Sequence, residues 1–114
     1  MATVSPALTQ HDNAVEILWE ACATGDTIVP ANLRDVAAIL GCVHAYGTWG
    51  SATVTLQGSN DENAAFLDLP DTAGAAISLI ANGLKDFSTG CMFIKPAFSG
   101  GTGDDVDVRL VLRK

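Results

Sequence analysis

The stretch Gly50-Ser-Ala-Thr-Val-Thr-Leu-Gln-Gly-Ser-Asn-Asp61 decides the fold class of this chain. Apolar and polar side chains alternate through residues 51–57. The apolar positions are Ala52, Val54 and Leu56, and the polar positions are Ser51, Thr53, Thr55 and Gln57. This alternation predicts a β-strand that has one buried face and one face in water. Residues 58–61 favour turn conformations, so the strand should end there.

Two further segments alternate in the same way, residues 14–22 and residues 105–113. The predicted inward positions are Val15, Ile17, Trp19 and Ala21 in the first segment and Val106, Val108, Leu110 and Leu112 in the second. A helix is an alternative at 14–22, because Glu, Leu and Ala favour one. Further strands are predicted near 36–46, 64–69 and 91–98, and residues 72–81 fit either a strand or a helix.

Short strands separated by Gly-rich turns, without a long helical run, predict an all-β fold. The 114 residues are enough for one domain and short for two. We therefore expect a single antiparallel β-sandwich or jelly-roll-like domain over residues 13–114. Its core should include Val54, Leu56, Val108 and Leu110.

Residues 1–12 are predicted to form a loose N-terminal arm, because they mix small, polar and apolar side chains around one proline. We expect this arm to become ordered against a partner, since an extended peptide can add to an exposed sheet edge through main-chain hydrogen bonds. The candidate partner-binding residues are Thr3, Val4, Pro6 and Leu8.

The composition narrows the range of partners. Apolar residues make up 48% of the chain, charged residues make up 17%, and the net charge is −7. The apolar content excludes intrinsic disorder, and a surface so low in charge suits contact with another protein. Nucleic acid and anionic membranes are disfavoured partners, because both need a basic patch. No apolar run is long enough to span a bilayer, and the N-terminus lacks the pattern of a signal peptide.

No constellation of residues in the sequence points to catalysis. The three cysteines, Cys22, Cys42 and Cys91, are expected to be reduced and unpaired, and neither His11 nor His44 stands in a recognisable catalytic context. The densest acidic cluster is Asp104, Asp105 and Asp107, whose spacing does not match the EF-hand calcium loop. Sequence therefore predicts a protein that is not an enzyme and has no catalytic, cofactor-binding or metal-binding residues. Trp19 and Trp49 are more typical of a core or an interface than of a sugar platform.

Several short motifs follow one another in a fixed order through most of the chain, each occurring once. They are Trp19-Glu20, Gly25-Asp26, Gly47-Thr-Trp-Gly50, residues 52–61, Leu67-Asp68, Ile94-Lys-Pro96, Ser99-Gly-Gly-Thr-Gly-Asp104 and the C-terminal Val-x-Val-x-Leu strand. This ordered set resembles the capsid decoration (head cement) proteins of tailed phages. The resemblance implies a structural virion protein that binds the outer capsid surface and clamps its subunits together. Its partner would be the major capsid protein, neighbouring copies on the capsid would be further contacts, and the protein would reach the virion after synthesis in the host cytoplasm.

The piece Gln57-Gly-Ser-Asn-Asp61 alone also resembles the strand and turn of discoidin-like jelly rolls. The resemblance implies a carbohydrate-binding jelly-roll module as the alternative function. In that group the turn is usually followed by glycine and an aromatic residue. This chain has Glu62, Asn63 and Ala64 instead, and Phe66 comes later. The departure weakens the transfer of a sugar site to this chain and leaves the sandwich topology in place.

Overall fold

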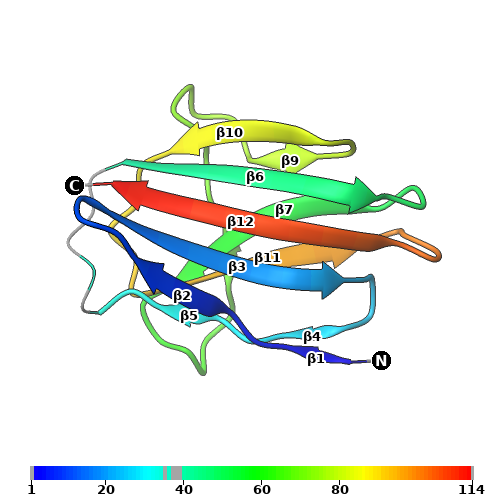
Figure 1. Ribbon diagram of the computed structural model, residues 1–114, viewed down its shortest axis with the longest axis horizontal. Helices are drawn as coiled ribbons and strands as arrows, with labels where there is room; N and C mark the ends of the chain where they lie inside the picture. Colours follow the sequence, from blue (N-terminus) through cyan, green and yellow to red (C-terminus); the bar gives the residue numbers. More distant parts are fainter. Residues whose placement is uncertain (1, 35, 37–39, 114) are drawn as a thin grey trace.

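The computed structural model describes residues 2–34, 36 and 40–113, and these residues form two packed β-sheets with no helix among them (Figure 1). The front sheet has the strand order β10 (Gly83–Phe87), β6 (Leu40–Thr48), β12 (Asp105–Arg113), β3 (Ala14–Cys22) and β2 (Ala7–Gln10). The back sheet has the order β5 (Ala31–Asn32), β11 (Phe93–Ser99), β7 (Thr53–Ser59) and β8 (Leu67–Asp68), and β9 (Ser78–Leu79) also pairs with β7. Within both sheets every pairing is antiparallel, while β1 (Thr3–Val4) and β4 (Thr27–Ile28) form a separate parallel pair.

The core lies between the two sheets and confirms the predicted β-sandwich. The four predicted core residues are at most 2% exposed: Val54, Leu56, Val108 and Leu110. Trp19 and Phe87 are the largest fully buried side chains, and both come from the front sheet. Period-two alternation on long antiparallel strands therefore supplied most of the core, as it should when one face of each sheet is covered and the other is not.

The predicted strands appear with different accuracy. Segments 14–22 and 105–113 are β3 and β12 with the same bounds, and the strand predicted at 51–57 appears as β7 two residues later. The strand predicted near 36–46 appears as β6 from Leu40 onward, and residues 37–39 of that prediction lie outside the described part of the chain. The segments 64–69 and 72–81 contain only the two-residue strands β8 and β9, since the rest of each is turn or irregular chain.

A bulge at the end of β3 reverses one predicted orientation. Ala21 was expected to face inward, but it has a φ of 55° and is exposed, while Cys22 is fully buried. The register shifts here, because Trp19 pairs with Val108 whereas Cys22 pairs with Val106. Two residues of β3 thus oppose Asp107 alone. The extra residue reverses the side of the sheet to which the following side chains point, so Cys22 faces the core. The Asp107 carboxylate accepts the Ala21 N–H at 2.8 Å and holds the bulge in place.

The N-terminal segment differs from the expectation of a loose arm, because residues 3–4 and 7–10 form strands β1 and β2. β2 joins β3 through a tight hairpin in which the His11 N–H donates to the Ala14 carbonyl at 2.8 Å. Closing such a short loop costs little entropy, and the pairing satisfies the main-chain groups along one edge of β3. All four residues of β2 nevertheless remain exposed, so β2 is held mainly by main-chain hydrogen bonds.

Candidate functional site

The outward side of the front sheet carries the most distinctive arrangement of side chains in the described residues. Paired residues on neighbouring strands point to the same side, so the register defines rows across the sheet. The central row is Leu84, His44, Arg109, Leu18 and Ala7. The row beside it is Asp86, Cys42, Val111, Glu16 and Thr9. The long strands β6, β12 and β3 therefore present one broad surface to solvent, seen face-on in Figure 1.

At the centre of this surface, four side chains form a connected group that we call the Tyr–Arg cluster: Glu16, His44, Tyr46 and Arg109. The Arg109 guanidinium donates to the Tyr46 hydroxyl from Nε (3.3 Å) and Nη2 (3.1 Å), and its Nη1 lies 2.7 Å from Glu16 Oε2. The His44 and Tyr46 rings lie 4.6 Å apart between centroids, inclined at 47°. Hydrogen bonds from Arg109 to Tyr46 and then to Glu16 raise the pKa of the guanidinium, so it stays protonated.

The ion pair between Arg109 and Glu16 contributes more to the geometry of the cluster than to stability. An ion pair as exposed as that between Arg109 and Glu16 is worth only about 0–1 kcal/mol. The effect of these contacts on geometry is larger. The Arg109 guanidinium is bound by Tyr46 on one side and by Glu16 on the other, so the rotamers of the side chain are restricted. Tyr and Arg side chains fixed in this way are the residue types that most often dominate binding energy at interfaces.

An apolar hollow of about 390 Å³ adjoins the Tyr–Arg cluster. Leu40, Cys42 and Val111 contribute apolar surface to it, and Asp86 and Arg113 carry the charges at its rim. Leu40 is 55% exposed, and Leu84 nearby in the central row is 61% exposed. Burial and then a hydrogen bond with Asp86 raise the pKa of the Cys42 thiol, which keeps it protonated and unreactive at neutral pH. We call the Tyr–Arg cluster, this hollow, Leu18 and Leu84 together the docking face.

The predicted acidic cluster does not converge on a common point. The Asp104 carboxylate is buried and accepts from the main-chain N–H and the hydroxyl of Thr24, at 2.8 and 2.9 Å. Asp107 instead holds the bulge at Ala21, and Asp105 is exposed. Among the residues that the structure describes, no group of three or more His, Cys, Asp or Glu side chains could hold a metal ion. The carboxylates of Asp104 and Asp107 thus serve to tie loops and strands together.

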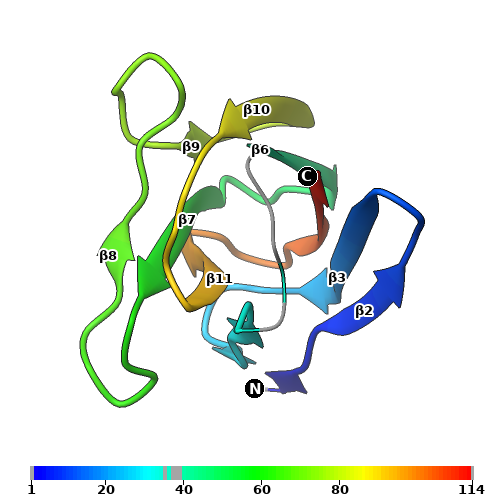
Figure 2. The ribbon, with the colours of Figure 1, turned by 90° about the vertical axis from the view of Figure 1, so that its left-hand side faces the viewer.

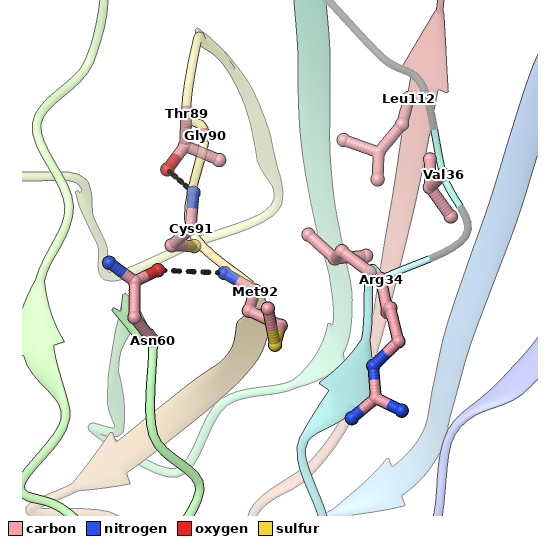
Figure 3. Close-up of a pocket in the computed structure, with 9 residues that line it drawn as sticks. Arg34, Val36, Asn60, Thr89, Gly90, Cys91, Met92 and Leu112 are labelled. Atoms are coloured by element: carbon pink, nitrogen blue, oxygen red, sulfur yellow. Dashed lines mark hydrogen bonds between the residues drawn. The ribbon is translucent and has the colours of Figure 1, made fainter.

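A second cavity, of about 270 Å³, opens at one end of the sandwich (Figure 3). Its lining residues are Leu33, Arg34, Val36, Asn60, Thr89, Gly90, Cys91, Met92 and Leu112. Two polar side chains of this wall are engaged with the main chain: Asn60 Oδ1 accepts the Met92 N–H at 3.0 Å, and Thr89 Oγ1 accepts the Cys91 N–H at 3.2 Å. The Cys91 thiol donates to the Phe93 carbonyl at 3.3 Å, and no histidine or carboxylate stands among the described lining residues. These described residues offer no pair of nucleophile and base.

Cys22 is a buried thiol whose protonation makes stability depend on pH. Burial, with added repulsion from Asp26, Asp107 and Asp105, raises its pKa to about 12. A thiol in the unfolded chain has a pKa near 8.5–9, so folding favours the protonated form. The stabilisation is complete below about pH 9 and is lost as the pH rises toward 12. We expect the free energy of unfolding to fall by at most about 1.4 kcal/mol per pH unit in that window.

Urea unfolding of the wild type and of Cys22→Val across this pH range measures the effect. The variant should show a shallower decline of the free energy of unfolding above pH 9, because valine has no thiol that could ionise in the unfolded chain. Cys42→Ser, which changes a half-buried thiol, should decline more nearly like the wild type. Equal slopes for the wild type and Cys22→Val would contradict the assignment.

The predicted partner-binding residues do not form one patch. Val4 is buried against the core, and Thr3 and Val4 pair with β4. Leu8 lies on β2 and is 51% exposed, and Pro6 stands between the two short strands. Neither tryptophan forms a sugar platform: Trp19 is in the core, and Trp49 packs against the core while its Nε1 donates to Asn82 at 2.7 Å. The alternation of residues 105–113 places Arg109 on the outward side, but its convergence with His44 and Tyr46 depends on the pairing of β6 with β12.

Comparisons with known proteins add little to this geometry. No protein-family model matches the chain, and no curated protein matches its sequence. Among solved structures, a similar one is the crystal structure of protein NMB1881 from Neisseria meningitidis, with 6% sequence identity, 96% of this chain and 83% of that chain covered, and a TM-score of 0.47. A likeness this distant carries no information about function, which has to come from the residues themselves. The described residues also contain no helix long and apolar enough to cross a membrane.

Proposed function

We propose that this protein is a structural virion protein that binds the outer surface of a tailed-phage capsid and stabilises the head. The ordered motif set described above supports the class of protein. One structural observation supports the mode of action: the prearranged Tyr–Arg cluster lies beside an apolar hollow on a broad, open sheet face. The partner is the major capsid protein, and the protein takes its place on the virion after synthesis in the host cytoplasm.

The composition of the docking face suits a protein partner. Interfaces typically have an apolar centre with aromatic and arginine residues and a polar rim. Here Leu40, Val111 and Leu84 supply apolar area, the Tyr–Arg cluster supplies oriented polar contacts, and Asp86 and Arg113 lie at the rim of the hollow. Because Arg109 is already fixed by Tyr46 and Glu16, little side-chain entropy is lost on binding.

Catalysis is a weaker proposal for the same surface. The Cys42 thiol has a raised pKa, which opposes its use as a nucleophile. The His44 ring in the central row lies against the Tyr46 ring, whereas Cys42 occupies the next row beside Asp86. A nucleophile needs a base within hydrogen-bond reach, and no such bond joins Cys42 to His44 in the structure. A binding role accounts for the arrangement of Cys42, His44 and Tyr46 without a chemical reaction.

Binding of purified protein to undecorated capsids tests the proposal. Tyr46→Ala removes the acceptor of both Arg109 hydrogen bonds and an aromatic contact, so we expect about 30-fold weaker binding, equivalent to about 2 kcal/mol. Thr55→Ala is the matched control, because it truncates an outward residue on the back sheet and should bind as the wild type does. Cosedimentation with capsids measures both. Unchanged binding by Tyr46→Ala would place the contact elsewhere, and no binding by the wild type would refute the function.

A carbohydrate-binding module is the second candidate, and the ring pair on the docking face favours it. Sugars stack on aromatic rings while neighbouring polar groups bind their hydroxyls, and His44 and Tyr46 stand next to Arg109 and Glu16. Screening against a glycan array, with Tyr46→Ala as the comparison, separates the two functions. A glycan bound by the wild type and lost in the variant would favour the module, whereas capsid binding unaffected by free sugars favours the virion protein.

A further inference from the structure

The four edges of the two sheets are protected to different degrees. At β10 the edge carries Lys85 and Asp86, and a loop covers part of it through the Thr72 N–H, which donates to the Asp86 carbonyl at 3.3 Å. At the back sheet the outer strands β5, β8 and β9 are two residues long. Charges, coverage and shortness are the devices by which proteins keep sheet edges from pairing with another chain.

β2 has neither charges nor a covering loop, and with four residues it is twice as long as the outer strands of the back sheet. Its four residues, Ala-Leu-Thr-Gln, are uncharged and exposed, contain no proline, and pair with β3 in an unbroken register. Among the described residues no strand lies beyond β2 in the front sheet, and Figure 2 shows it as the outermost strand on its side. This edge is therefore open and suited to pairing with another strand.

The hairpin determines which groups of β2 are free to pair. His11 and Ala14 share a hydrogen bond at the turn. Hydrogen-bonded and non-hydrogen-bonded pairs alternate along an antiparallel ladder, so Thr9 and Ala7 direct their main-chain groups toward β3. Leu8 and Gln10 consequently direct their N–H and C=O groups away from the sheet.

We propose that the open edge of β2 binds β2 of a second copy of this chain, antiparallel, with Thr9 on the two-fold axis. In this register Leu8 faces Gln10 of the second copy and Gln10 faces Leu8, so both N–H and both C=O groups of each strand find partners. A register centred on Leu8 is worse, because it sets Gln10 opposite Pro6, which has no N–H to donate. Thr9 facing Thr9 is a favourable cross-strand pair.

The charges of the chain limit where a second copy can bind, and the edge of β2 meets this limit. Two chains that each carry −7 repel one another, so they can associate only where no like charges meet. With Thr9 on the axis, His11 faces Ala7 and Asp12 faces Pro6. No charged residue of the strand or its turn opposes another, which a contact through the acidic loops near Asp104 and Asp105 would not achieve.

The pairing has a consequence that rests on the proposed function. A two-fold axis normal to the sheet joins five strands from each copy into one continuous sheet, and both docking faces point to the same side. Two linked faces bind a repetitive surface more tightly than either alone, provided that the spacing permits both to engage. The dimer itself does not depend on the identity of that surface.

Sedimentation equilibrium of the full chain tests the dimer. The wild type is expected to dimerise and Thr9→Lys to be monomeric, because the variant opposes two ammonium groups on the axis. Thr9 is exposed, so the folded monomer should tolerate the change, which the circular dichroism spectrum checks. Thr55→Lys makes the same substitution on the back sheet and should remain dimeric. A monomeric wild type, or a dimeric Thr9→Lys, would overturn the proposal while leaving the capsid-binding test untouched.

Cysteine cross-linking tests the register. Residues facing one another in a non-hydrogen-bonded pair have Cα atoms about 4.5 Å apart, within the range of a disulfide. Thr9→Cys should therefore form a covalent dimer on mild oxidation. Ala7→Cys should not, because four residues of offset separate the two copies of position 7 by roughly 13 Å. The wild type, with its three native cysteines, is the background control, and efficient cross-linking of Ala7→Cys in place of Thr9→Cys would refute the register.

Discussion

Replacing Trp19 with alanine is expected to lower the free energy of unfolding by about 3–5 kcal/mol. The side chain is 0% exposed and is the largest in the core. The cavity left behind cannot close easily, because β3 pairs with β12 on both sides of Trp19 and with β2 up to Leu18. A domain of this size has a total stability of about 5–15 kcal/mol, so the variant would stand near the unfolding threshold. Denaturant unfolding followed by far-UV circular dichroism measures the loss.

Two further variants separate the sources of that loss. The Trp19 indole N–H donates to the Val29 carbonyl at 2.8 Å, which joins β3 to the chain after β4. Trp19→Phe keeps most of the apolar volume but removes this donor, so it should cost about 1–3 kcal/mol. Trp49→Ala removes a tryptophan that is only partly buried and should cost less than Trp19→Ala. A loss below about 1 kcal/mol in Trp19→Ala would mean that the side chain is not in the core.

The sandwich was predictable because its long strands have one wet face. β12 keeps strict alternation from Val106 to Leu112, since it lies in the middle of the front sheet with solvent on one side and the core on the other. β7 follows the same rule in the back sheet, with Val54 and Leu56 inward. In such strands the side-chain period directly reports burial, and no knowledge of the neighbouring strands is needed.

The elements that sequence missed depend on partners far away in the chain. β10 contains Lys85 and Asp86 and begins at Gly83, which forms with Asn82 a pair typical of turns, so nothing local marks it as a strand. It exists because β6 offers it an edge to pair with. β2 and β1 likewise become strands only because β3 and β4 accept their main-chain hydrogen bonds. The inward turn of Cys22 depends on the bulge opposite Asp107, a contact between residues 86 positions apart.

Only part of the docking face could be predicted from the sequence, because some of its features depend on one strand alone and others on the pairing of distant strands. Alternation alone placed Arg109 on the outward side of its strand. The contacts of Arg109 with Tyr46 and Glu16 require β12 to lie between β6 and β3, an order that no local pattern encodes. The acidic residues gave the opposite result: Asp104, Asp105 and Asp107 are neighbours in sequence, yet Asp104 and Asp107 bind different main-chain groups. Proximity in sequence therefore suggested an acidic cluster that does not form, and it gave no sign of the Tyr–Arg cluster, whose members come from segments far apart in the chain.

Gly47→Ala is expected to destabilise the fold by about 2–4 kcal/mol, combining backbone strain with overpacking. Gly47 has a φ of +144°, a conformation that side-chain-bearing residues rarely adopt. A Cβ atom there would lie 2.3 Å from the Asp105 carbonyl oxygen and 3.0 Å from Val106 Cα, both main-chain atoms that cannot turn aside. The ladder between β6 and β12 would have to open at this end, and denaturant unfolding measures the cost.

Two other glycines make the comparison specific. Gly74→Ala meets no atom within 4 Å but has a φ of +89°, so it should show the backbone strain alone, about 1 kcal/mol. Gly90→Ala meets no atom within 4 Å and has no positive φ, so its effect should stay within about 0.5 kcal/mol. The loss of stability should be largest for Gly47→Ala, smaller for Gly74→Ala and smallest for Gly90→Ala. This order follows from steric contact and dihedral angle alone. If Gly47→Ala cost no more than Gly74→Ala, β6 and β12 would not approach each other at Gly47 and Val106 as closely as their register requires.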